Sequence, residues 1–583
     1  MRTPRRHAAT TSALAAGLFV IVLAFVGVFW SELDEHVLSE ITGDDDGDTV
    51  EVLDDTPPDT STPGPDANTT SIYREADVGF PSTLNPLLAS GSSENSAATL
   101  LYRSLLTTDD AGDPAPDLAT DWSISSDGLT YTLDLDPDAQ WHDGEPITAR
   151  DVLFTISLVQ SGDFTGSQTL SRFWRAISAE QADEHQIRFT LLEPYIGFLN
   201  YLRLPILPKH VFGDVLPEDL ADVPLDSYEV GSGAYQLSDI DPDQREIRFS
   251  RINQEENGGF PEVVVRYFNS RDDALAAFRD GDVDGVSFVP LDALRDDDAL
   301  PGSSQIYGPE MAGYTGLYFN VRHPYFREPD TRRAIEAAID RESIVESVLG
   351  GHAIAGSSPI PRMSSAHQPG DHNEYDPDVA RELLERDGWT LEDGDEMRQR
   401  DGEYFLVPMI VNSGDSQRIA VANLLQEQLR EVGISVDVQV MASDEVRGAL
   451  ESRQFTAAVY GWHTENGDLD GFELWHSSQG EEGMNFTGFA DPTADEALLE
   501  ARQASSIEER NEQYAEFQQA FAEQVPAVVL FYPRYHFAVS DWVQGAEPAP
   551  LVNPADRVRQ IPEWHERESS AASTRPAEVG GER

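Results

Sequence analysis

Alternation of apolar and polar residues predicts a β-hairpin between residues 122 and 135. A turn at Ser126-Asp127-Gly128 divides the segment, because Asp and Gly favour tight turns. The second half places apolar side chains at every other position, as in a strand with one buried face: Leu129, Tyr131, Leu133 and Leu135. Two helices flank the hairpin. Apolar spacing predicts the first over 97–106, and Thr148 is the expected N-cap of the second.

A strand–helix–strand unit is predicted over 409–440. Met409 to Asn412 forms an apolar strand, 418–431 has helical spacing, and Val436, Val438 and Val440 alternate with polar residues. Such a unit joins two parallel strands by a right-handed crossover. Ligands of open α/β sheets bind at the carboxyl ends of the strands, which here include Asn412.

A third strand-like run, 455–460, ends where the chain turns polar. The glycines of the following segment, 461–472, predict a loop. This loop combines aromatic residues with carboxylates, namely Trp462, Phe472 and the nearby Trp475 with Glu465, Asp468 and Asp470. An apolar floor with a few charges suits a pocket for a small cationic group. The alternative is an acidic surface loop.

Hydropathy also divides the N-terminal part of the chain. A basic head (1–12) precedes an apolar, uncharged run (13–30) that is long enough to cross a bilayer, and the charge asymmetry predicts that the bulk lies outside the cell. A cleaved signal peptide is the alternative, but the run ends in Val28-Phe29-Trp30 and lacks a small-residue cleavage site. Residues 31–71 are expected to form a disordered acidic linker, and 566–583 a disordered tail.

Composition narrows the function. A chain of 583 residues predicts several domains, and its formal charge of −65 argues against nucleic acid as a partner. Lys209 is the only lysine, and an acidic, lysine-poor surface indicates adaptation to high salt, where screening weakens self-repulsion. The absence of cysteine excludes disulfides, thiolate metal sites and a lipid-modified N-terminal cysteine.

Several segments, in order, resemble one family. The run DLATDWSISSDGLTYTLDLDPDAQWHDGEPITARDVLFTI (117–156) is similar to the signature of the dipeptide/oligopeptide/nickel-type extracellular solute-binding proteins, the receptors of ABC importers. Further similar segments are Val230-Gly-Ser-Gly-Ala-Tyr235, Arg271 to Val286, Tyr318 to Gly351 with its arginines Arg332, Arg333 and Arg341, and Tyr375-Asp-Pro-Asp-Val-Ala-Arg-Glu-Leu-Leu. The resemblance extends from about Ile72 to Trp564.

The resemblance implies a periplasmic-binding-protein-like α/β fold of two lobes joined by a hinge, with an extra subdomain inserted into the first. On this basis lobe I comprises 72–102, 228–308 and 525–565, the subdomain 103–227, and lobe II 309–524. The lobes are expected to close on a ligand.

The resemblance also implies a binding site. In the family's dipeptide receptors a loop similar to 461–468 carries the carboxylate that pairs with the peptide's ammonium group, and this position falls on Glu465, with Asp468 as second choice. Trp462, Asn466 and Asn412 are the other expected contacts in lobe II. The extended stretch Ser90, Gly91 and Ser92 is similar to the region that bonds the peptide backbone.

One departure concerns ligand length. Dipeptide receptors place an arginine for the ligand's carboxylate just after the strand at 407–412, whereas here the first arginine is Arg418. A longer peptide therefore fits better than a strict dipeptide, and another organic solute stays open. Nickel is disfavoured, because His463 and His476 alone are a weak ligand set.

The expected partners are a peptide ligand and membrane permease subunits, with a monomeric receptor and no cofactor. An extracellular hydrolase is the competing class. The chain has no Gly-x-Ser-x-Gly, His-Glu-x-x-His or phosphate-loop motif, although paired carboxylates of a glycosidase stay open. Trp141-His142-Asp143-Gly144 is interpreted as a strand-to-turn junction with a packed tryptophan rather than a catalytic site.

Overall fold

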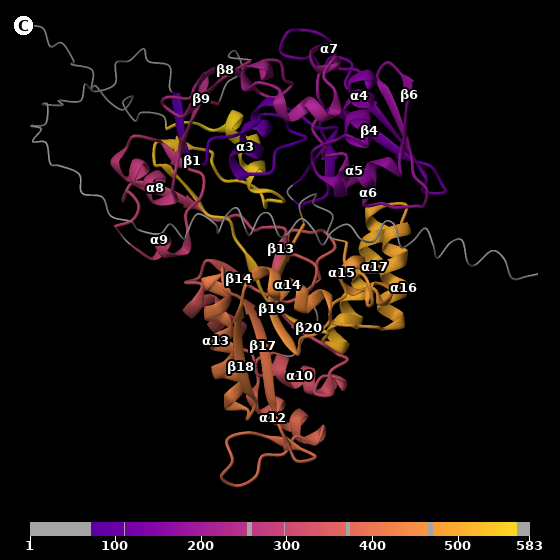
Figure 1. Cartoon of the computed structure of the whole chain (residues 1–583), viewed down its shortest axis with the longest axis vertical. Helices are drawn as coiled ribbons and strands as arrows, with labels where there is room; N and C mark the ends of the chain where they lie inside the picture. Colours follow the sequence, from indigo (N-terminus) through magenta and orange to yellow (C-terminus); the bar gives the residue numbers. More distant parts are fainter. Residues whose placement is uncertain are drawn as a thin grey trace, which may run out of the picture.

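The computed structural model shows two bodies stacked along the long axis (Figure 1). The first body consists of the first lobe and the inserted part, and the second body is the second lobe. Residues 72–567 are described, except 110, 253–258, 297, 369–373 and 465–469. None of the helices in this described part is long and apolar enough to cross a bilayer. The predicted head, anchor and linker (1–71) lie outside the described residues, as does the predicted tail from residue 568.

The first lobe is built on a seven-stranded mixed sheet. Its central strand, β1, pairs in parallel with β10 and β11, while β9, β8, β21 and β12 are added by antiparallel pairing. In sheet order the strands are β12 (Ser304–Tyr307), β21 (Phe537–Ser540), β11 (Gly285–Val286), β1 (Ile72–Val78), β10 (Glu262–Phe268), β9 (Glu246–Arg251) and β8 (Tyr235–Asp241). Helices α3 (Ser92–Leu101), α8 (Arg271–Asp280), α9 (Leu291–Arg295) and η5 (Pro554–Glu563) complete the lobe.

The inserted part carries its own antiparallel sheet, in the order β4 (Ala119–Ile124), β5 (Thr130–Leu135), β7 (Gln186–Thr190) and β6 (Ser178–Asp183). The predicted hairpin is confirmed by the pairing of β4 with β5. Thr148 is confirmed as the N-cap of α4 (Ala149–Gln160), since its hydroxyl accepts the Arg150 N–H. The remaining helices and short strands of this part are α5 (Gln168–Arg175), α6 (Phe198–Tyr201), α7 (Lys209–Phe212), η1 (Pro217–Asp222), η2 (Leu225–Tyr228), β2 (Leu106–Thr108) and β3 (Pro114–Pro116).

The helix predicted over 97–106 starts and ends earlier than expected. It is α3, which runs from Ser92 to Leu101, and Tyr102 is already extended. The reason lies at its start, where the Glu94 carboxylate accepts the N–H groups of Ser90 and Gly91 and so satisfies backbone donors that precede the helix. Apolar spacing alone does not detect such a cap.

The second lobe is built on a six-stranded sheet, in the order β14 (Ala353–Ala355), β20 (Ala527–Pro533), β13 (Gly313–Phe319), β19 (Ala457–His463), β17 (Leu406–Asn412) and β18 (Ser435–Met441). The predicted strand–helix–strand unit is confirmed, because β17 and β18 are parallel and α13 (Ser416–Glu431) joins them. The other helices are α10 (Pro329–Ala337), α11 (Arg341–Ser343), η3 (Ile344–Val348), α12 (Pro377–Arg386), α14 (Ser443–Glu451), α15 (Phe472–Trp475), η4 (Ser477–Gln479), α16 (Pro492–Gln503) and α17 (Ile507–Gln524). The short strands β15 (Gln399–Arg400) with β16 (Glu403–Tyr404), and β22 (Val543–Gln544) with β23 (His565–Glu566), form separate pairs.

The chain crosses between the two sheets at two adjacent connections, β12 to β13 and β20 to β21. The connections are bonded to each other, since Met311 N–H donates to Pro533 O and Tyr535 N–H to Pro309 O, both at 3.0 Å. The expected return to lobe I at residue 525 is wrong: β20 pairs with β13, so the chain returns only after Pro533. An apolar strand such as β20 does not reveal from its sequence which sheet it will join.

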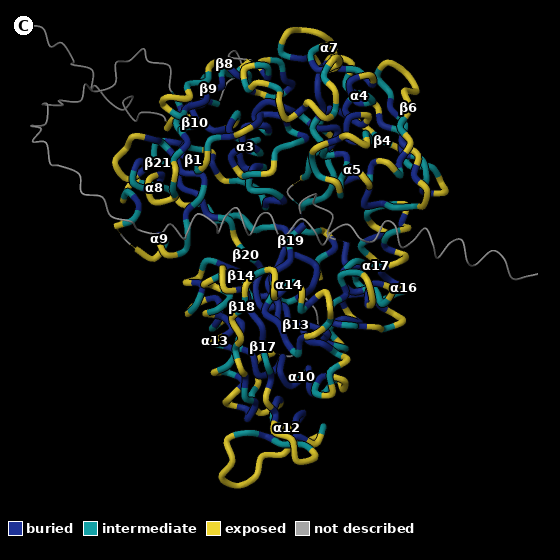
Figure 2. Tube along the Cα trace, in the orientation of Figure 1, coloured by how far each residue is buried: buried dark blue, intermediate teal, exposed yellow. Residues whose placement is uncertain are grey.

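A second contact between the bodies lies at the turn from α16 to α17. Here Ile196 N–H donates to Arg502 O at 3.0 Å, and the Arg502 guanidinium lies over the Tyr195 ring at 5.4 Å. Ala504 in this turn is buried against the core of the first body. Both bodies otherwise have interiors of their own, as the buried segments in Figure 2 show.

Candidate functional site

Strand β19 leads into the segment that the sequence indicates as a binding loop. The prediction that the strand ends at Tyr460 is wrong, because β19 continues to His463 and pairs with β13 along its whole length. Backbone pairing with β13 therefore outweighs the polar, glycine-containing sequence after Tyr460. Gly461 lies in the strand, where a Cβ would collide with the guanidinium of Arg418.

Both ends of the loop that follows are held in place. Thr464 N–H donates to Ala312 O at 3.0 Å, and the Asp470 carboxylate accepts the Phe472 N–H at 3.0 Å. Residues 465–469 between them lie outside the described residues, and with them Glu465, Asn466 and Asp468. Their roles stay predictions.

Asp470 belongs to a buried ion-pair group at the end of this loop. Arg502 donates from Nε to Asp470 Oδ2 at 2.5 Å and from Nη2 to Glu473 Oε1 at 2.6 Å. Burial alone would lower the pKa of Arg502, but the two carboxylates raise it well above its ordinary value. The guanidinium thus stays charged, and the group holds one positive and two negative charges.

The aromatic residues near the loop lie in the core of the second lobe. Phe472 and Trp475 are each 1% exposed and Trp462 is 8% exposed, packed against Tyr314 with a ring separation of 5.7 Å. The Phe472 ring is covered by His476 and by Arg502. These rings therefore belong to the core next to the loop. Trp462 exposes only a small part of its surface to a ligand.

Arg418 reaches the same site, which the sequence spacing did not indicate. It projects from the first turn of α13 to Gly461 and forms an ion pair with Asp415 at 3.2 Å. Burial, and then the charge of Arg418, lower the pKa of His463 to about 4. His463 is therefore neutral at neutral pH, beside a cation.

Asn412 is the last residue of β17 and is buried. Its Oδ1 accepts hydrogen bonds from Gly414 N–H at 3.0 Å and Ser443 Oγ at 2.9 Å. These bonds fix the turn that begins α13 and thereby the position of Arg418. A direct contact of Asn412 with a ligand stays a prediction.

In the first lobe, the expected extended stretch at Ser90, Gly91 and Ser92 is extended at Gly91 but becomes helical at Ser92, and its role in binding a peptide backbone stays a prediction. Gly91 is the N-cap of α3 and Ser92 its first residue, and the N–H groups of Ser90 and Gly91 already bind Glu94. Burial would raise the pKa of Glu94, but these bonds and those from Ser82 hold it below its ordinary value. Ser90 nevertheless lines a cavity of about 680 Å³ between the first-lobe and inserted elements.

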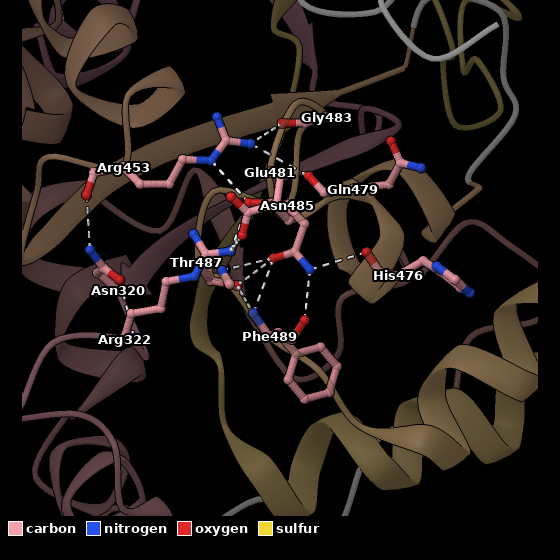
Figure 3. A network of polar contacts seen from close by, with 12 residues as sticks. Asn320, Arg322, Arg453, His476, Gln479, Glu481, Gly483, Asn485, Thr487 and Phe489 are labelled. Carbon is pink, nitrogen blue, oxygen red and sulfur yellow. Dashed lines mark hydrogen bonds and ion pairs between the residues drawn. The ribbon is translucent and has the colours of Figure 1, made fainter. Parts of the chain in front are cut away.

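A buried asparagine anchors the segment that follows α15 (Figure 3). The Asn485 side-chain amide donates to the carbonyls of Trp475, His476 and Phe489, and its oxygen accepts from Thr487 Oγ1 and from two backbone N–H groups. Asn485 begins the glycosylation sequon Asn485-Phe486-Thr487, but it is fully buried, so this sequon is inaccessible in the folded chain. The network fixes the segment between α15 and α16 to the end of α15.

The described ranges hold no group of three or more His, Asp or Glu residues that could bind a metal ion.

The segment Trp141 to Gly144 packs against the rest of the first body. Trp141 is 2% exposed, and the His142 Nδ1 accepts the Gly231 N–H at 3.0 Å. The interpretation of this segment as a packed junction is confirmed.

Comparison with known proteins agrees with this architecture. Residues 113–483 match the family model of bacterial extracellular solute-binding proteins, family 5 middle. The chain is 27% identical to the oligopeptide-binding protein AppA of Bacillus subtilis (strain 168), over 80% of this chain and 87% of that protein.

Two solved structures each align with 85% of this chain. The structure of Bacillus subtilis AppA in complex with a nonapeptide aligns with a TM-score of 0.60 at 25% identity, covering 85% of this chain and 99% of that one. The structure of NikZ from Campylobacter jejuni in complex with Ni(L-His) aligns with a TM-score of 0.63 at 24% identity, over 85% and 100%. With two lobes, an inserted subdomain and a family model that matches most of its length, this chain belongs to the bacterial extracellular solute-binding proteins of family 5.

Proposed function

We propose that this protein is a membrane-anchored extracellular receptor that captures peptides and delivers them to an ABC importer. Oligopeptides are preferred over strict dipeptides, and the lobes close on the ligand by bending at the two paired connections. Residues 13–30 anchor the chain, and the receptor acts as a monomer. The observation that carries this proposal is the match to an oligopeptide-binding protein over 80% of the chain.

In the proposed complex the peptide's ammonium group binds Glu465. Support comes from the charge around the loop, since its described end already has two carboxylates for one arginine. An added cation improves this balance, whereas an added anion worsens it. Trp462, Asn466 and Asp468 complete the contacts on this side, with Asn412 at the adjacent strand end.

The preference for longer peptides rests on Arg418. Its guanidinium lies at the site but is already paired with Asp415, so it is a weakened clamp for a carboxylate close to the ammonium end. The terminal carboxylate of a longer peptide lies farther from the ammonium group and outside the second lobe. It therefore does not compete with Asp415 for Arg418.

The test is thermal melting of the purified full-length chain in high salt with alanine peptides of two to eight residues, with sugars and with Ni²⁺–histidine. A ligand that binds the folded state raises the melting temperature by mass action. Peptides with a free amino group are expected to do so, and Glu465→Gln is expected to abolish the shift. Glu427→Gln is the matched control, because Glu427 is an exposed carboxylate on α13. A shift with sugar or nickel chelate alone would replace the peptide as ligand.

A further inference from the structure

The first body contains a cavity of about 680 Å³, within the range of small-ligand sites. Its walls come from the segment before α3, from α3 itself, from residues 165–172 around the start of α5, from residues 200–205 and from the start of η5. All of these elements belong to the upper body in Figure 1. The second lobe and its acidic loop do not line it.

The charge of this cavity is opposite to that of the protein. The chain as a whole carries −65, yet the charged residues lining the cavity are three arginines and one aspartate: Arg172, Arg203, Arg559 and Asp556. The other polar lining residues are neutral, and they include Ser90, Asn95, Thr99 and Asn200. A cationic cavity in so acidic a chain is an exception to its composition.

The single carboxylate is already fully used by its neighbours. Nη2 of Arg203 lies 2.9 and 3.0 Å from the two oxygens of Asp556, and Arg559 Nε lies 3.4 Å from Oδ1. The Asn553 N–H donates to Oδ2 at 2.9 Å. Burial would raise the pKa of Asp556, but Arg203 and Arg559 hold it below its ordinary value, so it stays ionised.

Donor capacity is left over in the same wall. Arg203 is only 10% exposed; its Nη2 is bonded to Asp556 and its Nε is buried, so it contributes mainly its charge to the wall. Arg559 is 24% exposed, and Asp556 is the one carboxylate paired with it there, through a long bond. Buried or half-buried guanidinium groups with spare donors are suited to a planar carboxylate.

We propose that this cavity binds an anionic group of the ligand, namely the carboxylate at the end of the peptide remote from its ammonium group. The inference rests on the proposed function and adds specificity to it. The ammonium end binds the acidic loop of the second lobe, and the carboxylate end binds Arg559 and Arg203 in the first body. The receptor therefore prefers peptides with a free carboxyl terminus to their amides.

The test measures calorimetric affinities of the full-length chain for alanine peptides of four to eight residues and for the same peptides as C-terminal amides, at one fixed salt concentration. The wild type is expected to bind the acid about tenfold more tightly than the amide, the size of a charge-assisted hydrogen bond. Arg559→Gln is expected to reduce this ratio towards one without weakening amide binding. Asp556→Asn, which removes the competing carboxylate, is expected to raise the ratio.

Arg188→Gln is the control, because Arg188 forms an exposed pair with Glu180 on the sheet of the inserted part. It is expected to leave the ratio unchanged. An unchanged ratio in Arg559→Gln, or equal binding of acid and amide by the wild type, would overturn the inference while the peptide receptor stands. Binding of neither form by the wild type would overturn the proposed function, and the inference with it. If Arg559→Gln does not fold, the ratio in Asp556→Asn decides, and a fall or no change overturns the inference.

Discussion

Each body holds a small group of ion pairs beside a candidate binding surface, and the two groups have opposite charge balance. In the second lobe Arg502 forms ion pairs with two carboxylates, those of Asp470 and Glu473. In the first body Asp556 forms ion pairs with two guanidinium groups, those of Arg203 and Arg559. Similar chemistry thus leaves one side negative and the other positive, which is the arrangement that suits a zwitterionic ligand held between the bodies.

The groups also differ in what surrounds them. The side chains of Asp470, Glu473 and Arg502 are 6%, 16% and 18% exposed, and Arg502 packs on Phe472 of the second lobe and on Tyr195 of the first body, so the negative group is packed where the two bodies touch. Asp556 and its arginines line an open cavity and are 10% to 24% exposed. The first group is therefore expected to contribute mainly to stability, and the second mainly to binding.

The largest expected effect is loss of the second-lobe group through Arg502→Ala. Two carboxylates would be left without their cation, and breaking a buried pair costs about 3 kcal/mol or more. The free energy of unfolding, measured by denaturant titration at pH 7, is expected to fall by about that amount. Arg188→Ala, which breaks an exposed pair, should change it by less than about 0.5 kcal/mol. Equal effects of the two substitutions would remove the distinction between the groups.

A smaller effect is expected from Asp556→Asn in the first body, and it should depend on pH. The folded pKa of Asp556 lies below the ordinary 3.8, so its stabilising effect is present above that value and is lost as pH falls through the folded pKa. At pH 7 the variant is expected to be about 1.5 to 3 kcal/mol less stable than the wild type, the size of a hydrogen bond to a charged group. The difference should shrink below about pH 4, when urea titrations are compared at successive pH values.

A difference that persists undiminished at pH 3 would show that Asp556 acts by packing rather than by charge. Asp495→Asn is a useful comparison, because Asp495 binds Ser477 but has no arginine partner in the described part of the chain.

The sequence patterns predict the parts of this molecule that depend on neighbours along the chain. The hairpin at 122–135, the cap at Thr148 and the unit from β17 to β18 all follow from local periodicity and turn chemistry. The errors occur where a distant partner decides. β19 continues through polar residues because β13 lies beside it, and β20 joins the second sheet although an early return was expected.

In the candidate site, too, the sequence indicates the local part but not the contacts between distant residues. A family resemblance indicates the loop after β19, but Arg203 and Asp556 are 353 positions apart, and no local pattern connects them. Likewise the position of Arg418 after the strand predicts no arginine at the site, but the first turn of α13 places its guanidinium against Gly461. The one available signal was the presence of arginines in an otherwise acidic chain.

Spectroscopy of His463 can sharpen the comparison on the second-lobe side. Its pKa is lowered to about 4 by burial and then by Arg418, so its contribution to stability is present above the ordinary 6.5 and is lost as pH falls towards 4. In Arg418→Gln the NMR-detected pKa is expected to rise, but to stay below 6.5 because burial persists. No change in the variant would mean that Arg418 does not act on this site.

Salt is expected to have the smallest effect on the buried ion pairs. Its effect on the melting temperature of the whole protein is expected to be larger. With a charge of −65, the melting temperature should rise between 0.1 and 2 M KCl as self-repulsion is screened. The stability lost in Arg502→Ala should change little over the same range, since buried pairs are poorly screened. A chain that is stable and monodisperse without added salt would contradict the predicted adaptation to high salt.

The most direct test of the account is photo-crosslinking of a bound hexapeptide, followed by mass spectrometry of the full-length chain. One peptide carries the photoreactive side chain next to its amino end, the other next to its carboxyl end. The account predicts that the first labels the second lobe around residues 460–475 and the second labels the first-body cavity near Ser90, Arg203 or Arg559. Labelling of the same site by both peptides, or the reverse assignment, would contradict a ligand held by its two charged ends.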